Sequence, residues 1–301
     1  MSGHRAQRGR ALPKRQRVAA YAVIVRGEEI LLSQLSRRVS PQGLWTLPGG
    51  GLDHGEDPRD AVRREVLEET GLDVAIGDTA RVYSAHRPRA RRDGRSADYH
   101  ALRIVYDGWV APGAPEPRVL EVDGSTQAAA WHPLAAVRDG SLRVVPMVAE
   151  ALADYRPYSL QRTAAYALIR RGDQVLLTRI SQRGAHPGSW TLPGGGIDFG
   201  ETPRDAVRRE VRKECGIDCE VDDLLAVHDV HFGGTAPSGR FEDFHGIHLL
   251  YRARVADSAR PRVVELDGTT DAVAWVSLAD VEAGAVEVLA VVTEALRADD
   301  T

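Results

Sequence analysis

The sequence predicts an α/β protein made of two tandem domains with the same fold. The chain repeats itself, because the segment from Gln16 to Tyr21 returns with one change from Gln161 to Tyr166. Each half contains a run in which apolar and polar residues alternate, as in a strand, and a charged segment with the signals of a helix. A length of 301 residues is also that of about two domains.

The repeat sets the expected domain boundaries. We expect a basic tail over residues 1–17, domain 1 over 18–154, a connection over 155–161 and domain 2 over 162–301. The tail contains several Arg and Lys residues without apolar periodicity, which predicts a disordered arm.

Near the start of each domain, apolar alternation predicts a β-hairpin. The hairpins are expected over 21–32, turning at Arg26-Gly27, and over 166–177, turning at Arg171-Gly172.

A helix of about three turns follows in each domain. Asp57-Pro58 and Thr202-Pro203 are typical of an N-cap followed by proline in the first turn, and Gly71 and Gly216 are typical of helix ends. Helical periodicity returns over 144–152 and 286–296, which predicts a closing helix in each domain.

One glycine and five charged residues stand at fixed spacing in the first helix of domain 1 and in the loop before it: Gly50, Glu56, Arg64, Glu65, Glu68 and Glu69. The last three stand at i, i+3 and i+4, so their carboxylates share one helix face. Carboxylates this close repel by roughly 4 kcal/mol per pair at 4 Å with an effective dielectric near 20. A hard divalent cation relieves that repulsion, and oxygen ligands suit Mg²⁺ or Mn²⁺ rather than Zn²⁺.

Domain 2 repeats this arrangement with one change. Glu210 and Glu214 keep two of the three carboxylates, and Lys213 stands where domain 1 has Glu68. The ammonium of Lys213 can neutralise the remaining carboxylates. We therefore expect domain 2 to bind fewer metal ions than domain 1.

The spacing, Gly, five residues, Glu, seven residues, then Arg-Glu-U-x-Glu-Glu-x-Gly-U with U aliphatic, resembles the signature box of the Nudix hydrolase superfamily. The resemblance covers nearly the whole chain and implies two α/β/α sandwich domains with mixed sheets. It also implies an Mg²⁺-dependent enzyme, with Mn²⁺ as the other cation to test, that cleaves the phosphoanhydride bond of a nucleoside diphosphate linked to another moiety. ADP-ribose-like compounds and (d)NTPs belong to that class.

By this resemblance each charged residue has a role. Glu65 and Glu69 are the central metal ligands, Glu68 is a further ligand or a base, and Gly50 offers its backbone carbonyl. Arg64 and Glu56 form an ion pair that orients the helix. The candidate metal ligands are Gly50, Glu65, Glu68, Glu69, Glu210 and Glu214, and the candidate catalytic residues are Glu68, Glu69, Arg64 and Glu56. A solvated acidic helix with i, i+4 ion pairs is the alternative interpretation.

Substrate contacts are expected outside the box. The segment 86–95 contains five arginines, and guanidinium groups bind phosphate in bidentate fashion, so Arg87, Arg89 and Arg91 are candidates. The Arg and Gly content also predicts a polar hairpin loop. Pro88 lies sixteen positions after Leu72, a spacing that resembles ADP-ribose pyrophosphatases.

Three further residues are candidates for contacts with substrate or water. His100, in Asp98-Tyr99-His100, is a candidate for binding a base, while a core role is the alternative for the aromatic beside it. Glu121 and Asp123 are candidates for a general base, and a plain Asp-Gly turn is the alternative.

Composition limits the classes of partner that we expect. A net charge of −4 argues against extensive nucleic-acid binding, although the basic tail offers one such contact. The sequence has no apolar run of membrane-spanning length and no secretory signal, so we expect no membrane partner and a cytoplasmic location. Cys215 and Cys219 are expected to be free thiols.

The duplication predicts either pseudo-twofold packing of the two domains or a homodimer. Three functions follow from the pattern: a metal-dependent hydrolase of a nucleotide-derived small molecule with domain 1 catalytic, a nucleotide-binding sensor or regulatory protein with one or both domains inactive, or a structural role for domain 2.

Overall fold

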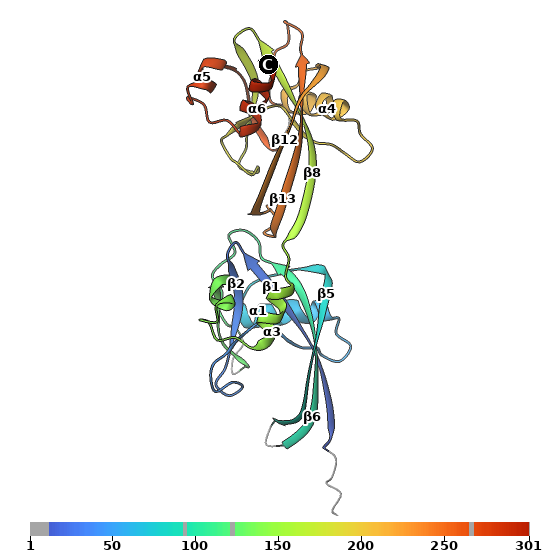
Figure 1. The fold of residues 1–301 in the computed structure, drawn as a ribbon, viewed down its shortest axis with the longest axis vertical. Coiled ribbons are helices and arrows are strands. Elements are labelled where there is room, and N and C mark those ends of the chain that lie inside the picture. The colour runs from blue at the N-terminus through green and yellow to red at the C-terminus, as the bar shows by residue number, and fades with distance from the viewer. Residues whose placement is uncertain (1–11, 93–94, 121–123, 265–267, 301) are drawn as a thin grey trace, which may run out of the picture. The chain divides into compact units, whose positions relative to one another are not determined.

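The computed structural model describes residues 12–92, 95–120, 124–264 and 268–300. Its helices and strands follow one another in the same order twice (Figure 1). The first series is β1 (Lys14–Arg26), β2 (Glu29–Leu35), β3 (Trp45–Thr46), β4 (Gly49–Gly51), α1 (Pro58–Thr70), β5 (Ala75–Arg92), β6 (Arg95–Trp109), β7 (Thr126–Pro133), α2 (Leu134–Arg138) and α3 (Pro146–Asp154). The second series is β8 (Tyr158–Arg171), β9 (Gln174–Ile180), β10 (Trp190–Thr191), β11 (Gly194–Gly196), α4 (Pro203–Cys215), β12 (Glu220–Thr235), β13 (Phe241–Arg254), β14 (Thr270–Ser277), α5 (Leu278–Glu282) and α6 (Ala290–Asp299).

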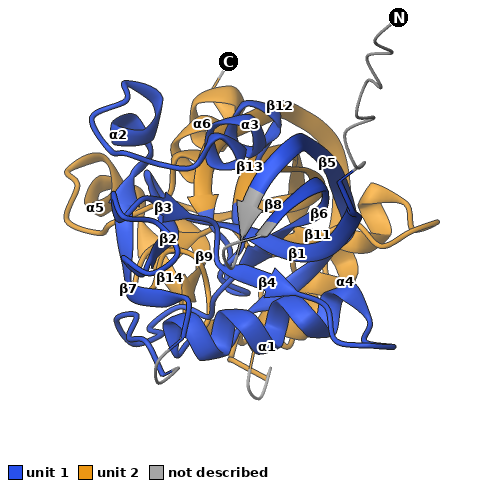
Figure 2. Cartoon of the chain, turned by 90° about the horizontal axis from the view of Figure 1, so that it is seen from below, with its two compact units in different colours: residues 1–157, 235–241 blue, residues 158–234, 242–301 orange. Residues whose placement is uncertain are grey.

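The chain forms two compact units, residues 1–157 with 235–241 and residues 158–234 with 242–301 (Figure 2). Strand β1 begins at Lys14, inside the range expected as tail, and β8 begins at Tyr158, inside the range expected as connection. Both strands start early because their first residues already pair in parallel with β6 and β13. None of the helices in the described ranges is both long enough and apolar enough to span a bilayer.

Each series forms a mixed sheet of seven strands. In the first the order is β3-β2-β1-β6-β5, with β4 paired to β1 and β7 paired to β2, and the second sheet repeats this order. Strands β1 and β6 are parallel, whereas β1 pairs with β2 and β4 in antiparallel fashion. The predicted mixed sheets are confirmed.

The two faces of the central strand β1 bury different helices. Ala22 and Ile24 belong to a core that includes Val62 of α1, and Val23 and Val25 belong to a second core with Met147 and other residues of α3. Successive side chains of a strand point to opposite faces, so a single strand supplies both cores. Domain 2 is built in the same way, with α4 and α6 on the two sides. The α/β/α sandwich is confirmed.

The charged helices begin and end where the sequence predicts. The Asp57 carboxylate accepts a hydrogen bond from the Arg59 N–H at 2.8 Å, and Gly71 ends α1 in the left-handed conformation with φ 69°. In α4, Thr202 Oγ1 accepts a hydrogen bond from the Asp205 N–H at 3.3 Å, and Gly216 ends the helix in the left-handed conformation with φ 65°.

The closing helices start later than predicted, at Pro146 and Ala290. The residues before them are extended because Val144 and Val288 form bridges with Trp45 and Trp190.

The arginine-rich segment differs from its prediction. Strand β5 continues to Arg92 and β6 begins at Arg95, so the segment is the end of a long hairpin and the prediction of a loop is wrong for most of it. A bulge between Arg87 and Ala90 accommodates Pro88, which has no N–H to donate to the ladder.

Candidate active site

A bidentate ion pair holds the start of α1 against the loop before it. Arg64 Nε and Nη2 donate to the two carboxylate oxygens of Glu56 at 2.9 and 3.0 Å, and Nη2 also donates to the Gly51 carbonyl at 3.2 Å. The Asp53 N–H donates to Glu56 as well, at 2.8 Å. The hydrogen bonds from Arg64 are the main reason that the pKa of Glu56 falls to about 2. Glu56 and Arg64 thus form an ion pair that links the loop to α1, and its role in catalysis stays a prediction.

Glu65 lies directly against the backbone of β4. A Cβ atom on Gly50 would sit 2.4 Å from the Glu65 carboxyl carbon, so only glycine permits this approach. Arg64 Nη1 donates to Glu65 Oε1 at 3.0 Å and fixes the side chain. The Glu65 carboxylate thus lies beside the Gly50 main chain, which was predicted to supply a carbonyl ligand.

Glu69 is the most buried of the three carboxylates, with 2% of its surface exposed. One oxygen accepts hydrogen bonds from Ser33 Oγ at 2.9 Å and the Gly49 N–H at 3.0 Å, and the other accepts from Thr126 Oγ1 at 2.6 Å. Burial raises the pKa of Glu69 to about 7, although these donors oppose the shift. Glu69 therefore ties α1 to three strands in addition to its predicted role as a ligand.

Glu68 faces solvent more than its two neighbours. Its side chain is 44% exposed, and Arg64 Nη1 lies 3.5 Å from one of its oxygens. It is the box carboxylate with the most freedom to turn toward a ligand above the helix face.

The donor set of domain 1 fits a hard divalent cation. Glu65, Glu68, Glu69 and the Gly50 carbonyl offer oxygen only. In the described ranges of the structure, no group of three or more His, Cys, Asp or Glu side chains already stands as a metal centre. Arg64 donates to Glu65, and two hydroxyl groups and one backbone N–H donate to Glu69.

Domain 2 keeps the ion pair and the buried glutamate. Arg209 Nε and Nη2 each donate to Glu201 at 2.8 Å, and Arg209 also donates to the Gly196 carbonyl at 2.9 Å. Glu214 accepts from the Gly194 N–H at 3.0 Å and from Thr270 Oγ1 at 3.0 Å.

Domain 2 departs from domain 1 at Glu210, the carboxylate whose side chain lies against Gly195 of β11. Lys213 Nζ donates to Glu210 Oε2 at 3.3 Å, and Arg209 donates to the other oxygen of Glu210. The Glu210 side chain is only 8% exposed, so these two cations act on a nearly buried carboxylate. Both oxygens of one predicted metal ligand are thus already bound by cationic groups.

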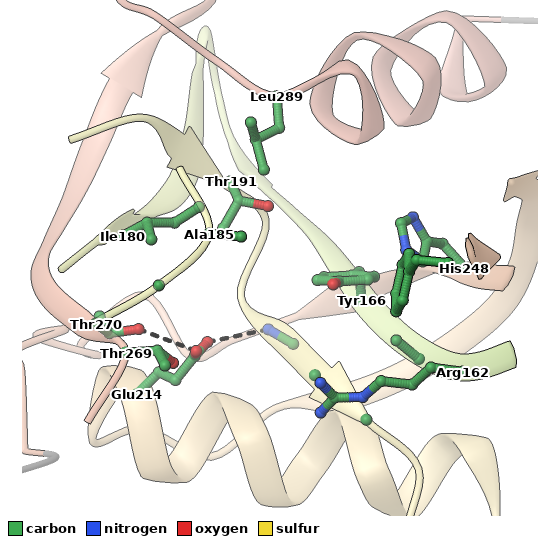
Figure 3. Close-up of a pocket in the computed structure, with 16 residues that line it drawn as sticks. Arg162, Tyr166, Ile180, Ala185, Thr191, Glu214, His248, Thr269, Thr270 and Leu289 are labelled. Carbon is green, nitrogen blue, oxygen red and sulfur yellow. Dashed lines mark hydrogen bonds between the residues drawn. The ribbon is translucent and has the colours of Figure 1, made fainter. Parts of the chain in front are cut away.

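A pocket of about 280 Å³ opens beside this site in domain 2. Figure 3 shows Glu214 and Arg162 on the side of the pocket nearest the helix, with dashed lines from Glu214 that include its bond to Thr270. Tyr166 and His248 lie next to Arg162, and Leu289 lies at the opposite end. The pocket therefore extends from Glu214 on α4 to Arg162 and Tyr166 on β8.

The other predicted substrate contacts fall in different places. Arg87 pairs with Tyr99 across the β5–β6 hairpin and shares a sheet face with it, and Arg89 is exposed at the bulge. The side chain of Arg91, and Glu121 and Asp123 as a whole, lie outside the described residues.

His100 lies on the opposite face of the sheet from Tyr99 and Arg103, because side chains alternate along β6. Its ring is hydrogen-bonded to Ser84 Oγ at 2.8 Å and to Gln16 Nε2 at 3.3 Å. The structure therefore does not bring His100 to the box carboxylates.

Sequence reasoning missed residues of β1 and β6 that the fold brings to this site. The guanidinium of Arg17 lies against Gly51, where a Cβ would be 3.0 Å from it. Burial raises the pKa of Tyr21, and the nearby charges of Arg17 and Arg103 oppose that shift. The exact repetition of Gln-Arg at 16–17 and 161–162 was a signal for Arg17 and Arg162, whereas nothing in the sequence pointed to Arg103.

Two tryptophans and the two cysteines are not among the predicted site residues: Trp131, Trp275, Cys215 and Cys219. Both tryptophans pack against the hydrophobic cores. Cys215 and Cys219 are free, and burial raises the pKa of both thiols.

Comparison with known proteins identifies the family. The model of the NUDIX domain matches the chain twice, over residues 15–152 and 160–296. The chain therefore belongs to the NUDIX family and carries two NUDIX domains in tandem. The expectation of a hydrolase acting on acid anhydrides in phosphorus-containing compounds is confirmed at the level of this family.

The relatives include curated proteins and a solved structure. The chain is 33% identical over 120 residues to nucleoside triphosphatase NudI of Enterobacter sp. (strain 638), which covers 39% of this chain and 82% of the relative. It is 32% identical over 130 residues to nucleoside triphosphatase NudI of Klebsiella pneumoniae (strain 342), covering 40% of this chain and 86% of the relative. The crystal structure of MutT NUDIX hydrolase from Burkholderia pseudomallei is similar with 34% identity and a TM-score of 0.33, covering 40% of this chain and 85% of that chain.

Proposed function

We propose that domain 1 is an Mg²⁺-dependent pyrophosphohydrolase, with Mn²⁺ as an alternative cation, that cleaves the phosphoanhydride bond of a nucleoside triphosphate or another nucleoside diphosphate derivative. The observation that carries this proposal is the complete carboxylate set of α1, with Glu65 pressed against the Gly50 backbone. Domain 2 lacks one of these carboxylates, so catalysis is assigned to domain 1.

The residues of domain 1 have separate roles in this proposal. Glu65, Glu69 and the Gly50 carbonyl hold the cation, and Glu68, the most exposed of the three carboxylates, is the further ligand or the base that accepts a proton from water. Glu56 and Arg64 are positioning residues. The bound cation would polarise the phosphoryl oxygen and lower the pKa of the attacking water.

The basic residues on the adjoining strands suit the phosphate groups of the substrate. Arg17 and Arg103 lie near Tyr21, and Arg87 shares their side of the sheet. Guanidinium groups bind phosphate oxygens through charge-assisted hydrogen bonds. The names of the curated relatives, nucleoside triphosphatases, support a triphosphate as the first compound to test.

A substrate panel tests the proposal. Full-length protein is assayed with canonical NTPs and dNTPs, oxidised-guanine nucleotides, ADP-ribose, NADH, dinucleoside polyphosphates and nucleotide sugars, with Mg²⁺ and separately with Mn²⁺. We expect at least one compound to be cleaved at a phosphoanhydride bond, and EDTA to stop the reaction. A folded protein that gives no product with any compound and either cation would refute the proposal.

Three expectations about the whole protein remain predictions: the cytoplasmic location, the limited role of nucleic acid, and the pseudo-twofold packing or homodimer. Size measurement in solution, together with a filter-binding assay for RNA and DNA, addresses the last two.

A further inference from the structure

The pocket of domain 2 has an aromatic side that we call the ring wall. Tyr166, Phe244 and His248 line the pocket, and His228 and Phe232 extend the ring wall beyond the lining by contacting His248 and Phe244. The His248 ring centroid lies 5.2 Å from that of Tyr166 and 5.4 Å from that of His228, and the Phe232 and Phe244 centroids are 5.3 Å apart. These separations are those of aromatic rings in contact. A flat heterocycle can stack on such a surface whichever base it is.

Gly246 allows the two parts of the ring wall to meet. A Cβ on Gly246 would lie 2.9 Å from His248 Nε2 and 3.0 Å from Phe244 Cε1, so both rings lean over this residue. Burial, together with the neighbouring His228, lowers the pKa of His248 to about 4. The His248 ring is therefore neutral at pH 7 and offers a stacking and hydrogen-bonding surface rather than a charge.

Arg162 supplies a cation at the end of the ring wall next to Tyr166 (Figure 3). A Cβ on Gly196 would lie 2.6 Å from Arg162 Nη2, so the guanidinium rests on the backbone of β11. Across the described parts of the chain, Arg162 has neither an ion-pair partner nor a hydrogen bond. A guanidinium in this position suits an anion with several oxygens, such as a phosphate group.

Lys213 removes the main obstacle to binding an anion here without a metal. A phosphate brought near three carboxylates is repelled by each of them, whereas Lys213 replaces one negative charge by a positive one and also binds Glu210. The other Glu210 oxygen is bound by Arg209. Gly195, against which the Glu210 side chain lies, lines the pocket. The charges on α4 therefore make the electrostatic potential at this edge of the pocket less negative than the charges on α1 make it at the matching edge of domain 1.

We propose that domain 2 binds a nucleoside 5′-monophosphate without a divalent cation, with the base on the ring wall and the phosphate at Arg162. A volume of about 280 Å³ is near the lower end of the range of roughly 300–1,000 Å³ for ligand pockets, which favours one nucleotide over a dinucleotide. The proposal takes only its ligand class from the proposed function of domain 1.

The test is a binding measurement on the full chain in EDTA. AMP, GMP, CMP and UMP are each titrated by calorimetry, with inorganic phosphate and adenosine as the partial ligands. We expect at least one monophosphate to bind at one site per chain, more tightly than either partial ligand. Phe244→Leu keeps apolar bulk but removes the stacking ring, and Arg162→Ala removes the cation, so each should weaken binding at least about tenfold.

Matched variants locate the site. Arg17→Ala makes in domain 1 the change that Arg162→Ala makes in domain 2, and it should leave the metal-free binding unchanged. Lys213→Glu should weaken binding in EDTA, and added Mg²⁺ should restore part of it. Thermal melting of each variant checks that it is folded.

Three results would overturn the proposal: no monophosphate binds the folded protein in EDTA, binding appears only with Mg²⁺, or binding is lost in Arg17→Ala and kept in Arg162→Ala. None of these outcomes depends on hydrolysis by domain 1. Failure of the substrate panel and failure of this binding test are therefore separate results.

Discussion

The two domains share one fold and the same Arg–Glu ion pair at the start of the box helix, but they carry different charged residues on that helix and on the neighbouring strands. In domain 1 the helix carries three carboxylates, and Arg17 and Arg103 lie on the strands next to Tyr21. In domain 2, Lys213 replaces one carboxylate and His248 occupies the position of Arg103. Domain 1 thus has more negative charge on its helix and more positive charge on its strands.

The difference on the helix and the difference on the strands both suit a cation and a polyphosphate in domain 1 better than in domain 2. A site that holds a divalent cation and a polyphosphate needs carboxylates for the cation and guanidinium groups for the phosphates. A site that holds one phosphate and a base needs fewer of both, and gains from aromatic rings. The pair of exchanges, rather than Lys213 alone, separates the domains.

What stayed the same is also informative. Glu69 and Glu214 each accept a hydrogen bond from a glycine N–H on the short strand and from a threonine hydroxyl. A buried acceptor in this position stabilises the sandwich whether or not a cation binds. The presence of Glu214 is therefore accounted for by the fold and is weak evidence for catalysis in domain 2.

The largest expected effect is that of Glu69→Gln compared with Glu214→Gln. Loss of the Glu69 charge should lower kcat/KM for hydrolysis by about 100- to 1,000-fold, because a ligand of the cation is removed. Glu214→Gln should change it by less than about threefold, since domain 2 is not assigned to catalysis. Steady-state rates measure the effect, with thermal melting as the control because both side chains are buried. Equal losses of activity in two folded variants would show two comparable active sites.

The next effect comes from exchanging the residues that distinguish the helices. Glu68→Lys copies domain 2 into domain 1 and should lower hydrolysis about 10- to 100-fold by placing an ammonium among the ligands. Lys213→Glu should add a binding site for Mn²⁺, seen by calorimetry as a higher stoichiometry, with little gain in hydrolysis. If Glu68→Lys retains full activity, Lys213 does not explain the difference between the domains.

A smaller effect is expected on the strands. Arg103→His copies the residue of domain 2 and should raise KM for a triphosphate about fivefold to tenfold while kcat changes little, because one charge-assisted hydrogen bond to phosphate is lost. His248→Arg, the reverse change in domain 2, should leave both constants unchanged. A fall in kcat with unchanged KM in Arg103→His would show that the residue acts on the reaction step instead.

The smallest effect is on stability in EDTA. Burial raises the pKa of Glu69 from 4.5 to about 7, so the folded state favours the protonated carboxyl. This contribution to stability is complete below about pH 4.5 and is lost as the pH rises through about 7. The Tm of the metal-free protein should therefore fall between pH 5 and 7.5, and Glu69→Gln should reduce that fall. The exposed Glu150→Gln on α3 is the control, which should leave the fall in place, and an unchanged fall in Glu69→Gln would contradict the prediction.

The helix of each box could be predicted from sequence in most of its detail. Its N-cap, its glycine end and the common face of its carboxylates depend on residues within a few positions of one another, so local rules suffice. The difference in charge at Lys213 was also visible, because the repeat places it at the position of Glu68. The sandwich itself came from the resemblance and from the alternation of apolar residues along the first strands.

The strands that complete the site were decided by tertiary structure. Arg103 reaches the site because β6 pairs in parallel with β1, while its near neighbour His100 faces the other way. A shift of one residue in that register would reverse the two, and no local pattern specifies it. Ser33 and Thr126 became partners of Glu69 for the same reason, since strand pairing joins residues far apart in sequence. The sequence by itself thus determined the helix, its charges and the duplication. Tertiary structure decided which strand residues lie beside the helix carboxylates, because the periodicity of a strand gives the alternation of its side chains but not the partner across the sheet.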